Sequence, residues 1–149
     1  MQAVIFVILA VITGSIISLQ NVINASLGRY VGELGAVFIV ATIGVLIILA
    51  AIIIRPGSAD FHALPGADRW YLYLGGVFGI IIVTLPVFLV PRIGATSTIT
   101  GIVIGQLVMA LAADQFGLFG TPRIEVSVSG VIGVILLGAG AFLVVRVPR

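Results

Sequence analysis

The sequence contains no cysteine and no lysine, and only 8% of its 149 residues are charged. The absence of cysteine excludes disulfides, thiolate metal sites and thiol nucleophiles. Soluble domains carry about a quarter of their residues as charged side chains, so this composition excludes an ordinary soluble domain. All seven basic residues are arginines scattered along the chain, and the net charge is +2. We therefore expect no nucleic-acid partner.

Most of the chain is apolar: 61% of its residues are hydrophobic and the mean hydropathy is +1.38. Each of five apolar runs is near the roughly 20 residues that cross a bilayer as a helix. None alternates as the strands of a membrane barrel do. The sequence predicts an all-α integral membrane protein, a single five-helix transmembrane domain over residues 1–149. Its expected spans are 3–24, 34–54, 70–90, 95–116 and 126–145.

Short polar segments separate these runs, and we predict loops at 27–33, 55–69, 91–94 and 120–125. The first run has no basic residue before it, so we interpret it as a membrane helix and not as a cleaved signal. Aromatic residues at 70, 71 and 73 fit the headgroup level of a membrane. Pro86 is expected to kink the third span, because proline removes a backbone hydrogen bond.

Small residues recur four apart on three of the spans, a spacing that lets helices approach closely in lipid. The third span has a GxxxG pair, the fourth a longer ridge, and the fifth a Ser/Gly pair. We predict helix packing at Gly75, Gly79, Ser97, Gly101, Gly105, Ser129 and Gly133.

The arginines are almost evenly divided between the two sides of the membrane. With five spans, one side holds Arg55, Arg69 and Arg123, and the other holds Arg29, Arg92, Arg146 and Arg149. An excess of basic residues on one side normally orients a membrane protein. Three against four favours insertion in both orientations, with two copies pairing antiparallel. Orientation by a partner subunit, or by the one-arginine difference, are the alternatives.

A few polar side chains interrupt the spans. Gln20 and Asn24 lie on the first, and Gln106 and Asp114 on the fourth. The amides could join helices by hydrogen bonds or line a solute cavity. Asp114 is the one acid that could lie within a span, where ionisable groups usually face a cavity or a partner. It could also lie at the interface, solvated or paired with Arg123 or Arg92.

No constellation typical of an enzyme is visible: there is no Ser/His/Asp set, no HExxH and no phosphate loop. His62, Asp60 and Asp68 are too sparse for a metal site. We expect no catalytic activity, no cofactor and no bound metal.

Four segments resemble the YdcZ-like family of the drug/metabolite transporter superfamily: SLQNVINASLGRYVG (18–32), WYLYLGGVFG (70–79), VPRIGATST (90–98) and GQLVMALAADQFGLFG (105–120). The resemblance implies a five-helix chain that is one half of a ten-helix inverted-repeat transporter, in the prokaryotic cytoplasmic (inner) membrane. Family members occur as dual-topology proteins, as oppositely oriented pairs or fused. The recurrent polar positions match Gln20, Asn24, Gln106 and Asp114. Ala110 and Gln115 depart from the family pattern, in which Ser and His are frequent, and this weakens a hydroxyl or proton-relay role there.

From these features we predict a small secondary transporter. It would be an antiparallel homodimer with alternating access for a small metabolite or drug-like solute. Gln20, Asn24, Gln106 and Asp114 are the candidate substrate-binding residues, contributed by both copies. A proton-coupled mechanism would require Asp114 to take up a proton within the membrane. The alternatives are a dual-topology channel and a non-transport membrane assembly subunit, in which the amides only join helices.

Overall fold

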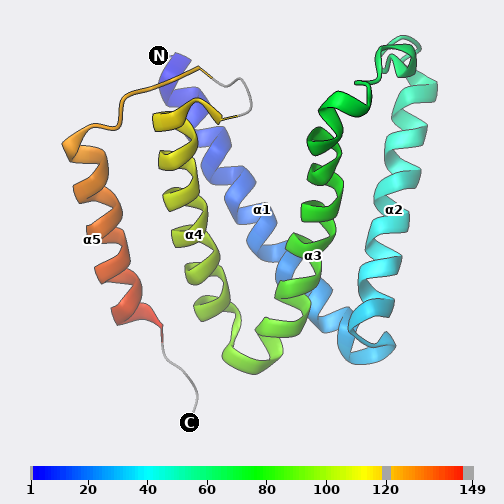
Figure 1. The fold of residues 1–149 in the computed structure, drawn as a ribbon. Helices are drawn as coiled ribbons and strands as arrows, with labels where there is room; N and C mark the ends of the chain where they lie inside the picture. Colours follow the sequence, from blue (N-terminus) through cyan, green and yellow to red (C-terminus); the bar gives the residue numbers. More distant parts are fainter. Residues whose placement is uncertain (1, 119–121, 146–149) are drawn as a thin grey trace. The chain divides into compact units, whose positions relative to one another are not determined.

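Helices account for nearly all regular structure in the computed structural model, which describes residues 2–118 and 122–145 (Figure 1). Four of them, covering Val4–Val31, Glu33–Ile54, Ala67–Ile93 and Ala95–Phe116, are long and apolar enough to cross a membrane; the fifth is shorter and also apolar. The elements are α1 (Gln2–Val31), α2 (Glu33–Ile54), the 3-10 helices η1 (Phe61–Ala63) and η2 (Ala67–Tyr73), α3 (Leu74–Ile93), α4 (Ala95–Phe116) and α5 (Val128–Val144). The all-α membrane class predicted from composition is confirmed.

The chain divides into two compact units, Met1–Pro91 and Arg92–Arg149, which we describe separately. In the first unit α1 packs against α2. A small core forms where Ala36 and Val37 of α2 meet Val87 of α3, and Leu27 and Val83 pack against it. Val83 and Val87 are four residues apart, so they lie on one face of α3. The prediction of one transmembrane domain over the whole chain stays a prediction.

Two single glycines make the turns before α2 and before α4. Gly32 has φ 79° and ψ 160°, and Gly94 has φ 81° and ψ 156°. The carbonyl of each accepts a hydrogen bond from the amide four residues on, Ala36 N to Gly32 O at 3.0 Å and Thr98 N to Gly94 O at 3.1 Å. This region of backbone conformation is essentially restricted to glycine. One glycine therefore separates α1 from α2, and another separates α3 from α4.

These turns are shorter than the loops expected from the sequence. Segment 27–33 is helical as far as Val31, and segment 91–94 is helical as far as Ile93. Polar residues suggested loops there, but Arg29 and Arg92 lie in the last turns of their helices, where a positive charge is favourable to the helix dipole. Pro91 continues the helix, and Pro86 is buried within it.

Gly28 is the closest helix-packing position in the first unit. A Cβ at this position would lie 2.8 Å from Val87 Cγ1. We expect Gly28→Ala to destabilise the protein by about 1 kcal/mol, because overpacking outweighs the helix propensity that alanine gains. Reversible unfolding in mixed micelles measures this. Val87→Ala in the same chain should recover part of the loss, whereas additive effects of the two changes would contradict the proposed contact.

The longest connection, residues 55–73, is held by short-range polar contacts. The Asp60 carboxylate accepts a hydrogen bond from the His62 amide at 2.9 Å. The Tyr73 hydroxyl donates to the Pro65 carbonyl at 2.9 Å. Trp70, in η2, is 62% exposed. Its position at the headgroup level of a membrane stays a prediction.

In the second unit α4 packs against α5. α4 ends at Phe116, followed by Gly117 in the left-handed conformation, whose amide donates to Ala113 O. α5 begins after Ser127, whose hydroxyl oxygen accepts from Gly130 N at 3.1 Å. Both helix ends facing the connecting segment are therefore capped, which fixes where the two helices meet it.

Candidate functional site

The four predicted substrate-binding residues lie on α1 and α4, one pair in each unit. On α1, Gln20 is exposed, whereas only 4% of Asn24 is exposed. On α4, Gln106 is exposed and Asp114 is partly buried. Their assignment as substrate ligands stays a prediction.

A stripe of buried residues runs along the second half of α1. Asn21, Asn24 and Ala25 are buried, and Gly28 meets Val87 one turn further on. These four positions follow the spacing i, i+3, i+4, i+7, which defines one face of a helix. Gln20 lies beside this face and not on it. The buried pair of amides is therefore Asn21 and Asn24, which the spacing of the asparagines and the adjoining small residues could have indicated.

The predicted packing glycines are open within their own units. A Cβ at Gly75, Gly79, Gly101, Gly105 or Gly133 would meet no atom within 4 Å. Ser97, in contrast, is buried near the start of α4, and Ser129 exchanges a hydrogen bond with Ser127 at 2.9 Å. The role of these small residues in helix packing stays a prediction.

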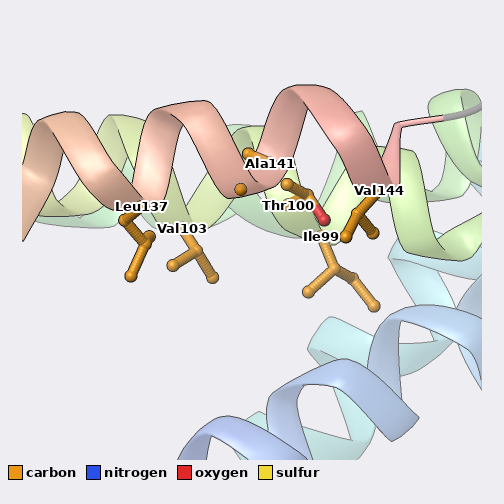
Figure 2. Close-up of a pocket in the computed structure, with 7 residues that line it drawn as sticks. Ile99, Thr100, Val103, Leu137, Ala141 and Val144 are labelled. Atoms are coloured by element: carbon orange, nitrogen blue, oxygen red, sulfur yellow. The ribbon is translucent and has the colours of Figure 1, made fainter.

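Two adjoining pockets lie between α4 and α5. The first has a volume of about 420 Å³ and is lined by apolar side chains and one hydroxyl. Figure 2 labels Ile99, Thr100 and Val103 of α4, with Leu137, Ala141 and Val144 of α5. The second pocket, also of about 420 Å³, lies further towards the end of α4 and shares Leu137 with the first. Together they form a groove along the α4–α5 pair.

Asp114 lines the second pocket. The other lining residues are apolar or glycine, among them Ala110, Gly130 and Gly133. Gln106, which the eight-residue spacing placed on the face of Asp114, is not among the described residues that line it. The carboxylate and the Gln106 amide are therefore not brought together in this pocket.

The backbone around Asp114 is fixed by the segment that leads to α5. Ile124 N donates to the Asp114 carbonyl at 2.9 Å. Val126 N donates to Gln115 Oε1 at 2.9 Å. Gln115 thus has a structural partner that the sequence did not indicate: its side-chain oxygen satisfies a backbone donor just before α5. These two hydrogen bonds hold the connecting segment against the end of α4.

The ion pairs considered as an alternative for Asp114 are not found among the described residues. Across residues 2–118 and 122–145, no ion pair joins Asp114 to Arg123, which is exposed. Arg92 precedes α4, and Ala95 at the start of α4 is about 28 Å from Asp114 along the helix axis. Arg92 of the same chain is therefore out of reach.

Comparison with known proteins shows that the sequence matches one family. The family model described as "Putative inner membrane exporter, YdcZ" matches residues 5–143. The inner membrane protein YdcZ of Escherichia coli (strain K12) is 29% identical over 111 residues, which cover 74% of each chain. No solved structure matches. The expected membrane location is confirmed: this is a multi-pass protein of the inner, cytoplasmic membrane, and the description of its family is that of an exporter.

Proposed function

We propose, on the premise that the chain belongs to the YdcZ family of inner membrane exporters, that it is a secondary transporter built from two antiparallel copies. The solute is a small metabolite or drug-like molecule. Each copy provides half of the transport path, and the pair alternates between an inward-open and an outward-open state. The observation that carries this proposal is the spacing of the seven arginines along the chain, which five spans would divide almost evenly, three against four.

An antiparallel pair reproduces a plan that many secondary transporters use. In those proteins two halves of inverted topology are related by a pseudo-two-fold axis in the membrane plane, and the solute binds between them near the midplane. A chain with an odd number of spans, inserted in both orientations, builds that plan from one sequence. The four apolar helices and the shorter α5 supply these spans.

The candidate ligands fit a polar but mostly uncharged path. Gln20, Asn24 and Gln106 carry amides that both donate and accept hydrogen bonds, and Asp114 adds one carboxylate. An exposed polar side chain on a membrane helix, such as Gln106, is costly against lipid. A second copy and an aqueous path would remove that cost.

The first experiment measures the orientation of the chain in the membrane. Because the sequence has no native cysteine, an introduced cysteine is the one thiol that can be labelled. Ser58 lies in the connection between α2 and α3, and Tyr30, 87% exposed, lies beside the α1–α2 turn. Ser58→Cys and Tyr30→Cys place one thiol at each end of the spans. We expect an impermeant maleimide added to intact cells to label about half of each variant, and permeabilised cells to be labelled completely.

Complementary labelling would overturn the antiparallel homodimer. If one variant reacted fully from outside and the other not at all, the chain would have one orientation. The protein would then need an oppositely oriented partner or would serve as a non-transport subunit. Saturable counterflow in proteoliposomes separates a transporter from a channel once orientation is known.

A further inference from the structure

The pocket that contains Asp114 combines one carboxylate with an otherwise apolar lining. Asp114 is the one residue with a polar side chain among its described lining residues, and the rest are Leu, Ala, Val or Gly. An ionised carboxylate beside an apolar surface needs a compensating charge or hydrogen-bond donor. No arginine is among the described residues that line this pocket, and the chain has no lysine.

The helix ends nearby do not supply the missing positive charge. Asp114 lies in the last turn of α4, whose C-terminal end carries a partial negative charge. Gly130 lies in the first turn of α5, whose N-terminal end is partially positive, but its amide already donates to Ser127 Oγ. The two partial charges have opposite signs and similar size, so the full charge of the carboxylate dominates the pocket.

The pocket also has room for a molecule. Its volume of about 420 Å³ falls in the range of small-molecule sites, roughly 300–1,000 Å³. Gly133 contributes no side chain, and a Cβ there would meet no atom within 4 Å. The space is therefore lined by aliphatic side chains and glycines, with the Asp114 carboxylate as the one charged group among the described lining residues.

We propose that this pocket binds an organic cation, with an ammonium group at the Asp114 carboxylate and an apolar body along Leu107, Leu111 and Leu137. The charge of Asp114 selects the ligand's sign, and the apolar walls favour a hydrophobic body over a hydrated metal ion. That organic cations are the transported substrates rests on the proposed transport function. That the pocket binds an organic cation depends on the pocket alone.

The experiment measures equilibrium binding of radiolabelled phenyltrimethylammonium to the purified full chain in detergent. We expect saturable binding that tert-butylbenzene, its uncharged analogue of the same shape, does not displace. Asp114→Asn should weaken binding at least tenfold, whereas Asp114→Glu should stay within a few-fold of the parent. Glu125→Gln is the matched control, because Glu125 is an exposed acid outside α4 and α5, and it should bind like the parent.

A second variant tests the pocket without touching its charge. Gly133→Leu fills the space and should also weaken binding at least tenfold, while Gly138→Leu, outside the described lining, should not. Equal binding by Asp114→Asn and the parent, or displacement by the uncharged analogue, would overturn the inference. If the cation binds through Asp114 but orientation proves single, the transporter proposal fails and the site remains. If counterflow is seen only for uncharged solutes, the transporter proposal stands and organic cations are overturned as its substrate class.

Discussion

Replacing Gly32 with alanine is expected to destabilise the protein by about 3 kcal/mol, at the upper end of the cost of a strained backbone conformation. Gly32 has φ 79° and ψ 160°, where a Cβ clashes with the backbone. The turn has no neighbouring loop residue to absorb the change, because α1 ends at Val31 and α2 begins at Glu33. Unfolding in mixed micelles, followed by circular dichroism, measures the loss.

Gly44→Ala is the matched control. Gly44 lies within α2, and a Cβ there would meet no atom within 4 Å. Alanine should be neutral or stabilise by up to about 1 kcal/mol, since it has the higher helix propensity. Gly94→Ala should behave like Gly32→Ala, because Gly94 has nearly the same angles. If Gly32→Ala and Gly44→Ala had the same stability, the single-residue turn would not be as described.

Two variants with an arginine excess on opposite sides of the membrane are each expected to lose transport when expressed alone. Co-expression of the two variants is expected to restore transport. The triple variant Ser58→Arg, His62→Arg and Arg29→Gln carries five arginines on one side against three on the other. The double variant Arg55→Gln and Arg123→Gln carries one against four. Each should insert in a single orientation, opposite to the other, because basic residues orient membrane proteins. Counterflow should fall at least tenfold for each alone and recover on co-expression.

The control keeps the charges and changes the side chains. Arg55→Lys with Arg123→Lys preserves three against four and should transport like the parent. Cysteine labelling establishes the orientation of each variant before transport is measured. Full counterflow by a variant whose orientation is shown to be single would rule out the antiparallel pair as the transporting unit.

Composition and the lack of alternation in the apolar runs were enough to predict the class of the protein, because only helices and closed barrels satisfy their backbone groups in lipid. The fourth span, predicted at 95–116, has the bounds of α4. Its ends are marked by Gly94 and Gly117, both with positive φ. Where a helix end is fixed by a residue that must be glycine, the sequence alone can locate it.

Polarity was a poorer guide to where α1 and α3 end. A helix need not stop where the membrane does, and Arg29 and Arg92 are favourable in a last turn. The start of α3 was placed four residues early, because the aromatic segment that opens it, residues 70–73, forms 3-10 helix. Local hydrogen bonding decides whether this segment forms 3-10 helix or α-helix, and hydropathy carries no information about that choice.

Of the candidate site, the sequence indicated Asp114 but not its surroundings. That Ala110 and Asp114 share a pocket with Gly130 and Gly133 depends on how α5 packs on α4. No spacing within one helix contains that information. The same holds for Gln115, whose partner, Val126, is eleven residues further along the chain.

The helices differ greatly in length, and this has a consequence for the lipid around them. α1 has 30 residues and α5 has 17, which correspond to about 45 Å and 26 Å along their axes. A bilayer has one hydrocarbon thickness, about 30 Å, so a long helix tilts while the membrane beside a short one thins. In an antiparallel pair both copies impose the same mismatch from opposite leaflets. The acyl-chain length of the surrounding lipid therefore affects both the tilt of α1 relative to the membrane normal and the depth of α5 in the bilayer.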